Sequence, residues 1–460
     1  MAQKLIISTE LSPRHQLQQL VADALARNHG VGAARLDPQG LDLQAQVFGE
    51  GTLTESEYPF TTREWKRGTP LADAPEIFRG DAKDVSSGAY LIRDSEGTIH
   101  GRGARRGISF FESENFVWHN GEWLKLDMPK KASFGGIVDG RILFSTNEEW
   151  RIGDTVYAPD SILSADLAEF KANPDTAAKT LVWAPGPKQT SQGSAITKDA
   201  LYVSLLDNVR GRVLRFNFDG GKWTSTPVAL PQNATVGIAA ASDTTGEVMF
   251  SSTDFLSPSQ LWYSDGTGAP AVLKTSPARF DATGLKISQF EATSKDGTKI
   301  PYFVVAKDGV KLDGNTPTLL YGYGGFQVPQ LPGYSGTLGK LWLEKGGAYV
   351  LGNMRGGGEF GPEWHQTAMG ANKQRTWDDF IAIGDDVVKR GLTSPKRLGI
   401  QGGSQGGLLV GTAFTQRPDL FNAAIVAIPL FDMLRLHLIG RGASWVGEYG
   451  DPRIPEQRAW

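Results

Sequence analysis

The residues best suited to chemistry form the run Gly402-Gly403-Ser404-Gln405-Gly406, in which a serine stands between small residues. A short apolar, strand-like run at 397–401 precedes it, and a helix-like run at 408–414 follows it. A serine on so sharp a strand-to-helix turn is held with its hydroxyl projecting clear, and the turn leaves no room for a neighbouring Cβ. Free N–H groups at the helix start would point at any oxyanion that forms there. The pattern predicts a nucleophilic Ser404, against the alternative of a structural glycine turn.

This context is typical of the α/β-hydrolase fold, in which the catalytic residues follow the order Ser, then Asp or Glu, then His. Only residues 405–460 follow Ser404, and the fold needs two more strands with the acid and the histidine on loops at their ends. The one histidine in this stretch is His437, in a helix-like run after a strand, so we expect it not to be the general base. The chain is therefore expected to lack the catalytic Asp and His.

Composition limits the classes of function open to the chain. Its 460 residues are 40% hydrophobic and 21% charged, which is ordinary for a globular protein of two or three domains. The net charge of −3 gives no reason to expect nucleic acid or a membrane as a partner. The absence of cysteine excludes disulfides, thiolate metal sites and a cysteine nucleophile. Residues 1–8 do not resemble a secretory signal, and no run approaches the roughly 18 apolar residues of a membrane span. We expect a cytoplasmic protein without cofactor or metal.

Residues 40–284 are rich in short alternating stretches separated by Gly, Asp, Asn and Pro. Many short strands at regular spacing predict a sandwich, a barrel or a propeller. Weak repeats at 120–126, 219–223 and 261–266 place an aromatic residue beside a hairpin turn, which favours a β-propeller whose tryptophans pack in the blades. The repeat is too loose to count blades. Residues 1–39 stay unassigned, although one apolar face over 15–28 is compatible with a helix.

From residue 285 onward, strands alternate with longer helical segments, which predicts a parallel sheet with crossover helices. The expected elements are a hairpin over 287–306, strands at 318–322, 347–352, 397–401 and 423–427, and a helix at 376–390. The longest apolar run, 423–430, suits a buried strand. Asp378 and Asp379 are expected to be first-turn carboxylates of the helix at 376–390 rather than metal ligands.

A second glycine-rich run, 356–361, formally fits the dinucleotide-binding pattern G-x-G-x-x-G and follows a strand. Pro362, Trp364 and His365 then occupy the place where the nucleotide-binding helix should open, and the next clear helix begins near Thr376. We therefore expect no nucleotide site here.

The second half of the chain resembles the prolyl oligopeptidase family, serine peptidases in which a β-propeller caps an α/β-hydrolase domain. The resemblance is carried by several motifs in the family's order: 295–301, 321–326, 353–361, 402–407, 416–421, Trp445 and 449–452, with weaker support from 254–258. It implies a propeller over 40–284 and an α/β-hydrolase domain over 285–460, each partial.

The resemblance also implies roles for individual residues. Ser404 would be the acyl-forming nucleophile, with the backbone N–H of Gln405 and the hydroxyl of Tyr323 as oxyanion donors. A phenol suits this role because it donates a hydrogen bond while staying neutral at pH 7. Trp445 and Phe326 would form the walls of a pocket for the proline ring of the substrate, and Tyr449 would line the same region. Without the resemblance, Trp445, Phe326 and Tyr323 are compatible with ordinary packing.

The family's catalytic Asp and His lie downstream of Trp460, and its N-terminal helical segment and first propeller strands have no counterpart here, so the sequence is expected to be an internal fragment truncated at both ends. The favoured hypothesis is a serine oligopeptidase that hydrolyses short peptides on the carboxyl side of proline. The alternative is a non-catalytic propeller and hydrolase-like protein that binds peptides or a partner. A lipase or esterase is disfavoured by the large propeller-like half. The sequence does not indicate an oligomeric state.

Overall fold

The computed structural model describes residues 41–45, 51–66 and 68–460, and the run 15–28 that we considered helical lies outside them. Contacts divide the chain into two compact units, Met1–Asp127 and Met128–Trp460. The domain boundaries near 40 and 285 stay a prediction. The expected architecture is confirmed, because antiparallel four-stranded sheets of propeller type precede a mixed sheet with helices of α/β-hydrolase type.

The first unit holds two antiparallel sheets. The three-stranded one is made of β1 (Leu41–Ala45), β2 (Thr61–Lys66) and β3 (Glu76–Arg79), with the short helix η1 (Leu71–Asp73) before β3. The four-stranded one is made of β4 (Ser86–Arg93), β5 (Ile99–Gly107), β6 (Ser113–His119) and β7 (Glu122–Lys125). Asn120 and Gly121 join β6 to β7 with positive φ values of 50° and 89°. Positive φ at both turn residues matches the twist of the two strands in a β-hairpin. Trp123 donates from its indole to the Ile77 carbonyl at 2.8 Å, so it is a packing residue.

Three further four-stranded sheets open the second unit. The first contains β8 (Ala132–Val138), β9 (Arg141–Thr146), β12 (Ile162–Asp166) and β13 (Thr180–Trp183), with β10 (Trp150–Ile152), β11 (Thr155–Tyr157) and α2 (Leu167–Ala172) as insertions. The second contains β14 (Gln189–Ile196), β15 (Leu201–Asp207), β16 (Arg210–Asp219) and β17 (Lys222–Pro227). The third contains β18 (Thr235–Ala241), β19 (Val248–Thr253), β20 (Gln260–Ser264) and β21 (Ala271–Thr275).

These sheets stack through the two faces of β15. Side chains alternate across a strand, so Leu201 and Val203 enter the core shared with the preceding sheet, whereas Tyr202 enters the core shared with the next. Trp223 spans the first of these interfaces by donating to Ser164 Oγ at 2.9 Å. A strand that is apolar on both faces therefore builds the face-to-face packing of propeller blades.

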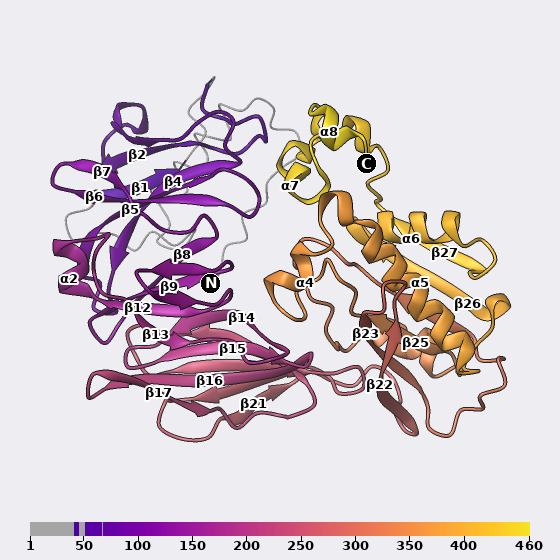
Figure 1. Cartoon of the computed structure of the whole chain (residues 1–460). Coiled ribbons are helices and arrows are strands. Elements are labelled where there is room, and N and C mark those ends of the chain that lie inside the picture. The colour runs from indigo at the N-terminus through magenta and orange to yellow at the C-terminus, as the bar shows by residue number, and fades with distance from the viewer. Residues whose placement is uncertain (1–40, 46–50, 67) are drawn as a thin grey trace. The chain divides into compact units, whose positions relative to one another are not determined.

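The last part of the second unit is a six-stranded sheet in the order β22-β23-β25-β24-β26-β27 (Figure 1). Its strands are β22 (Leu285–Thr293), β23 (Lys299–Lys307), β24 (Thr318–Tyr321), β25 (Ala348–Gly352), β26 (Leu398–Gly403) and β27 (Ala423–Ala427). The first three in sheet order are antiparallel, and β25, β24, β26 and β27 are parallel. The predicted hairpin and strands are confirmed to within a few residues.

Helices and short turns connect these strands. They are α3 (Gly336–Leu338), the π-helical turn η2 (Gly339–Leu343), α4 (Pro362–Gln366), η3 (Gly370–Asn372), α5 (Gln374–Lys389), η4 (Pro395–Arg397), α6 (Gln405–Gln416), η5 (Met433–Leu438), η6 (Gly442–Trp445), α7 (Val446–Tyr449) and α8 (Pro455–Arg458). We did not expect α4, which opens directly after the glycine-rich run, with a proline in its first turn. Proline suits that place because its missing N–H would have no intrahelical partner.

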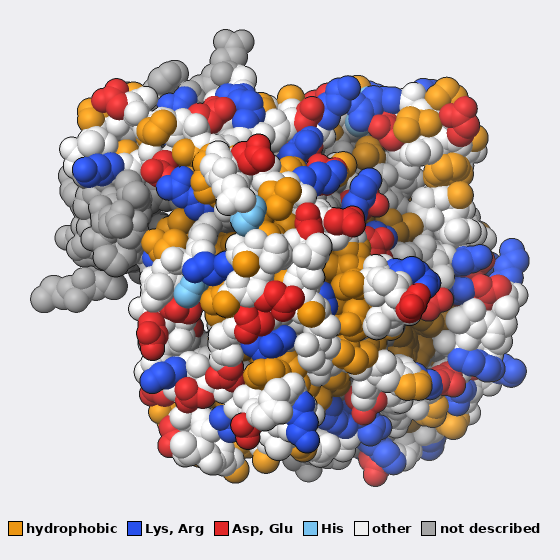
Figure 2. All heavy atoms as spheres, turned by 60° about the vertical axis from the view of Figure 1, so that its left-hand side comes forward, with side chains coloured by type: hydrophobic (Ala, Val, Ile, Leu, Met, Phe, Trp, Pro, Cys, Tyr) orange, Lys and Arg blue, Asp and Glu red, His pale blue; other side chains and the backbone are white. Residues whose placement is uncertain are grey.

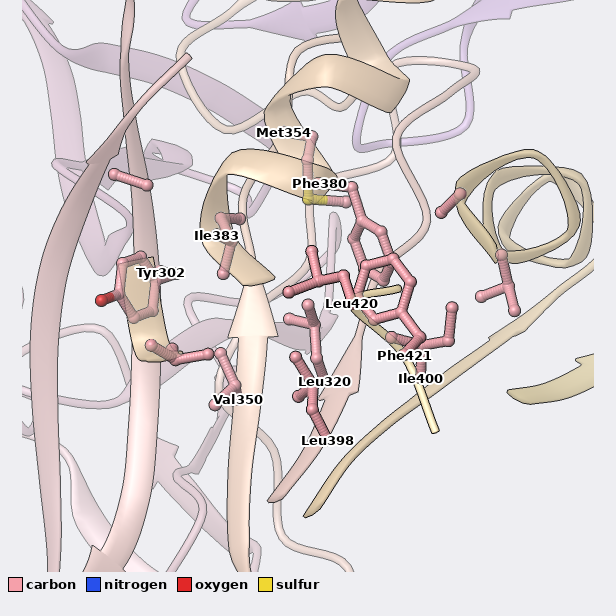
Figure 3. Close-up of a cluster of buried hydrophobic side chains, with 14 of the residues drawn as sticks. Tyr302, Leu320, Val350, Met354, Phe380, Ile383, Leu398, Ile400, Leu420 and Phe421 are labelled. Carbon is pink, nitrogen blue, oxygen red and sulfur yellow. The ribbon is translucent and has the colours of Figure 1, made fainter. Parts of the chain in front are cut away.

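The principal core lies between this sheet and the helices α5 and α6 (Figure 3). Tyr302 and Val304 of β23 face this core, whereas Phe303 and Val305 face a second cluster that includes Phe255. Both faces of β23 are therefore covered, which explains why this strand is apolar in nearly every position.

Two expectations about this region are wrong. Helix α5 begins at Gln374, so Asp378 and Asp379 lie beyond its first turn, and Asp379 is instead a buried ion-pair partner of Arg355 at 2.6 Å. Strand β27 is not buried: it lies at the edge of the sheet, and Ile425 is 53% exposed. Ile428, Phe431 and Leu434 beyond it are also exposed, so this edge presents apolar side chains.

Charged side chains of both signs are interspersed over the face shown in Figure 2, in keeping with the small net charge of −3. Among the described residues, no helix is both long and apolar enough to cross a membrane.

The core predicts a contrast between two phenylalanines. Phe380 of α5 is fully buried, and Phe380→Ala should lower the free energy of unfolding by about 3–5 kcal/mol, because it removes apolar contacts and leaves a cavity. Phe414 of α6 is 36% exposed, and Phe414→Ala should cost less than about 1 kcal/mol. Urea denaturation of both variants measures the difference; equal losses would contradict the assigned core.

Candidate active site

Ser404 lies between β26 and α6 in a backbone conformation that L-residues rarely adopt. Its φ is 57° and its ψ is −118°, and it is the N-cap of α6. The Ser404 N–H donates to the Ala427 carbonyl of β27 at 3.0 Å, which ties the turn to the neighbouring strand. Strain of this kind costs on the order of 1–3 kcal/mol and persists only where the surroundings enforce it. The predicted sharp strand-to-helix turn at Ser404 is present, and the role of Ser404 as a nucleophile stays a prediction.

Close backbone approaches explain the glycines around Ser404. A Cβ on Gly402 would lie 2.2 Å from the Gly406 carbonyl oxygen, and one on Gly406 would lie 2.6 Å from the Gly322 carbonyl oxygen. A Cβ on Gly403, in contrast, would meet Ala427 only at an ordinary 3.6 Å. The motif thus needs glycine at its first and last positions, and Gly403 is free of that constraint.

Tyr323 reaches Ser404 because of sheet register. Strands β24 and β26 are parallel neighbours with Tyr321 opposite Gln401, so the residues that follow each strand meet at the same edge. The Tyr323 side chain lies close enough to Ser404 for the serine to act on its pKa. Burial raises the pKa of Tyr323, although Ser404 acts against that rise, so the phenol stays neutral and able to donate.

Gln405 is fully buried and connects several parts of the site. Its backbone N–H belongs to the first residue of α6, which has no intrahelical acceptor. Its side-chain amide donates to the Gly324 carbonyl at 3.1 Å, and its side-chain oxygen accepts from the Tyr449 hydroxyl. The two oxyanion donors predicted from the sequence, Tyr323 and Gln405, are therefore both next to Ser404.

Of the three residues predicted to line a substrate pocket, Phe326 and Tyr449 contact each other, and Trp445 lies just before Tyr449 in the sequence. Phe326 and Tyr449 contact each other edge to face, with ring centroids 5.7 Å apart and an interplanar angle of 82°. Phe326 has a φ of 55°, which is costly for an aromatic residue. Trp445 is half-buried in η6, directly before the helix α7 that carries Tyr449. Its part in a substrate pocket stays a prediction.

Sequence reasoning missed a buried charge cluster behind these residues. Glu448 is fully buried and lies 2.5 Å from Lys373 Nζ and 2.6 Å from His365 Nε2. Burial pushes the pKa of Glu448 upward, but His365 and Lys373 outweigh it and the pKa is lowered; burial lowers the pKa of Lys373, with Glu448 acting against the change. Glu448 lies 75 positions from Lys373 and 83 from His365 in the sequence, so no local pattern could have revealed the cluster.

A second buried carboxyl, Glu359, lies within the glycine-rich run 356–361. One of its oxygens accepts from the Gln330 N–H at 2.8 Å, whereas Oε2 has no partner among the described residues. Burial raises the pKa of Glu359 to about 7, although its hydrogen bonds act against the rise. Gln330 lies four residues after Phe326, the predicted wall residue. The hydrogen bond to Glu359 therefore helps to fix the segment that carries Phe326.

His437 lies half-buried in η5, and its Nδ1 has no hydrogen-bond partner in the part of the chain that the structure describes. No hydrogen bond between the described residues joins Ser404 to a histidine. No group of three or more His, Asp or Glu side chains within 41–45, 51–66 and 68–460 has a metal-binding arrangement.

The elbow geometry predicts opposite outcomes for two adjacent glycines. Gly402→Ala should displace the turn and lower the free energy of unfolding by about 2 kcal/mol or more, because its Cβ would collide with backbone that cannot move alone. Gly403→Ala is the matched control and should change stability by less than about 1 kcal/mol. Thermal or urea unfolding compares them, and an unstable Gly403→Ala with an intact Gly402→Ala would refute the assigned geometry.

Glu359 predicts a pH dependence of stability. Its pKa is about 7 when folded and its ordinary value is 4.5, so the folded protein keeps a proton that the unfolded chain loses. The free energy of unfolding should therefore fall between about pH 4.5 and 7, relative to that of Glu359→Gln, by about 3 kcal/mol in total, and level off above pH 7. Unfolding measured from pH 4 to 9 tests this. The exposed Glu363→Gln should follow wild type, and parallel curves for wild type and Glu359→Gln would be the contrary result.

The chain is similar to several known proteins. The sequence model of the prolyl oligopeptidase family matches residues 334–460. An uncharacterised peptidase of Sinorhizobium fredii is 44% identical over 416 residues, which are 89% of this chain and 57% of the relative. The prolyl endopeptidase of Elizabethkingia miricola is 38% identical over 224 residues, which are 48% of this chain and 32% of that protein.

A solved structure covers nearly all of the chain. It is described as a post-proline cleaving enzyme from Rickettsia typhi, and it superposes with a TM-score of 0.86 at 31% identity, over 92% of this chain and 62% of that one. The chain thus spans about three fifths of the length of the relatives it matches. Sheets of propeller type, a mixed sheet and a strained serine turn occur here in one chain, and this chain belongs to the prolyl oligopeptidase family.

Proposed function

We propose that the chain provides the nucleophile, the oxyanion donors and part of the substrate pocket of a serine oligopeptidase. The observation that carries the proposal is the strained Ser404, placed at the start of α6 with Tyr323 close to it. Attack of Ser404 Oγ on a peptide carbonyl would form an acyl-enzyme and release the amine. The developing oxyanion would accept from the Tyr323 hydroxyl and the Gln405 N–H.

A serine hydroxyl needs a general base to become a good nucleophile at neutral pH. None of the histidines among the described residues is hydrogen bonded to Ser404. We therefore propose that the general base and its acid partner are residues other than the described ones. Without that base, donors and binding alone leave only residual catalysis. We also propose that the protein is cytoplasmic.

We propose proline as the residue on the acyl side of the cleaved bond. The contacting rings of Phe326 and Tyr449 offer an apolar wall near Gln405, to which the Tyr449 hydroxyl is bound. A proline ring packs well on aromatic faces and has no N–H that burial would leave unsatisfied. Relatives named prolyl endopeptidase support the same class, and short peptides containing proline would be the partners.

The second candidate is a protein that binds peptides without cleaving them. The observation in its favour is the absence, among the described residues, of a hydrogen bond from Ser404 to a histidine. The strained serine with its tyrosine donor speaks against it, because a binding site has no need of such a conformation.

The proposal predicts a covalent adduct with a peptide aldehyde that ends in proline. The aldehyde of an N-acylated glycyl-prolinal should form a hemiacetal with Ser404 Oγ, detectable by NMR with a ¹³C-labelled aldehyde carbon. Its Kd should be at least about tenfold lower than that of the corresponding prolinamide, since only the adduct uses the oxyanion donors. A glycyl-alaninal peptide should bind about tenfold more weakly, because it fills less of the pocket.

Ser404→Ala is the control and should abolish the hemiacetal signal while leaving prolinamide affinity within about twofold. Binding of prolinamide without any hemiacetal in wild type would favour the non-catalytic candidate. Equal affinity for the prolinal and alaninal peptides would remove the proline assignment.

A further inference from the structure

Two buried side chains near Ser404 donate hydrogen bonds to the same backbone oxygen, that of Gly324. The Gly324 carbonyl accepts from Lys373 Nζ at 3.0 Å and from Gln405 Nε2 at 3.1 Å. A carbonyl oxygen has two lone pairs, so both are used here. Gly324 follows Tyr323 and has a φ of 66°, and a fixed carbonyl therefore fixes the peptide plane that leads out of the tyrosine turn.

The position of Lys373 is fixed by a buried ion pair. Its side chain is only 10% exposed, and its ammonium group lies 2.5 Å from Glu448, whose other oxygen lies 2.6 Å from His365 Nε2. Lys373 also lies near the ring of Tyr449, at 5.7 Å from the centroid. A buried ammonium group is costly unless it is paired and hydrogen bonded, and here it has both a carboxylate and a carbonyl.

A second path reaches the same carbonyl from the same helix. Tyr449, the residue after Glu448, donates its hydroxyl to Gln405 Oε1, and the amide group of Gln405 donates to Gly324. Glu448 and Tyr449 of α7 are thus connected to one oxygen through Lys373 on one side and through Gln405 on the other. We call this closed set of contacts, from Glu448 through Lys373, Gly324 and Gln405 to Tyr449, the carbonyl ring.

The space inside the carbonyl ring is filled. A Cβ on Gly325 would lie 2.6 Å from Gln405 Cγ and 3.2 Å from Glu448 Oε1. The turn that carries Tyr323 is therefore pressed against the ring and cannot tilt without breaking hydrogen bonds to a buried oxygen. Buried polar groups that lose a partner are expensive, which makes this arrangement stiff.

We propose that Lys373 is a positioning residue that aligns the Tyr323 oxyanion donor by clamping the Gly324 carbonyl. The proposal rests on the function proposed above. Lys373 touches no reacting atom. Its effect passes through Gly324 to the preceding residue, whose hydroxyl must be held within a few tenths of an ångström to stabilise an oxyanion.

The test compares an adduct that uses the oxyanion donors with a ligand that does not. For Lys373→Met, the Kd of N-acylated glycyl-prolinal should rise at least tenfold, while the Kd of the matching prolinamide should stay within twofold. Lys340→Met is the matched control, since it removes an exposed lysine that pairs with Glu344 at 2.8 Å, and it should change neither value.

Lys373→Met leaves Glu448 buried with one partner fewer and could fail to fold. The double variant Lys373→Met/Glu448→Gln replaces the ion pair with neutral groups of similar size, so it should fold while still lacking the clamp. Its prolinal affinity should be as low as that of Lys373→Met. Wild-type prolinal affinity in a folded double variant would overturn the proposal.

A double-mutant cycle with Tyr323→Phe distinguishes positioning from general support of the structure. In the Tyr323→Phe background the donor is already absent, so Lys373→Met should weaken prolinal binding by less than about twofold. A full tenfold loss in that background would contradict action through Tyr323. If wild type forms no hemiacetal, the proposed function fails and this proposal fails with it; a wild-type hemiacetal with unchanged Lys373→Met affinity refutes the positioning role alone.

Discussion

The backbone conformation of Ser404 is the constraint on which the rest of this region depends. A residue with φ of 57° and ψ of −118° returns to an ordinary conformation unless its surroundings prevent it. Here β26 is fixed between β24 and β27, the Ser404 N–H is bound to β27, and α6 starts immediately behind. Gly402 and Gly406 let the turn close against backbone oxygens where any side chain would collide. The core under the sheet therefore maintains the chemistry at its edge.

Much of this arrangement could be predicted because it follows from local patterns. Alternation of apolar residues located the strands, and the spacing of small residues around Ser404 located the turn. Once β24 and β26 are taken as parallel neighbours, the proximity of Tyr323 to Ser404 also follows, since both residues come directly after their strands. The weak aromatic repeats correctly indicated propeller blades because each tryptophan packs beside a hairpin.

What could not be predicted depends on pairs that are distant in sequence. Asp379 looked like a helix-start carboxylate, but α5 begins earlier and Arg355 draws Asp379 into the interior. Glu448 gave no signal at all, since its partners His365 and Lys373 belong to other segments. His365 itself lies in a helix that we did not expect, because a proline such as Pro362 can interrupt a helix as well as begin one. Strand β27 looked buried because its composition is apolar, yet composition does not tell an inner strand from an edge strand.

The double use of Tyr449 has a consequence for protein engineering. Its ring contacts that of Phe326 in the proposed pocket wall, and its hydroxyl holds the side chain of Gln405. A designer who replaced Tyr449 with a smaller residue to admit bulkier substrates would also release one side of the Gly324 carbonyl. Tyr449→Phe would keep the ring but release Gln405 in the same way. Libraries aimed at new selectivity should therefore vary Phe326 or Trp445 first and leave Tyr449 unchanged.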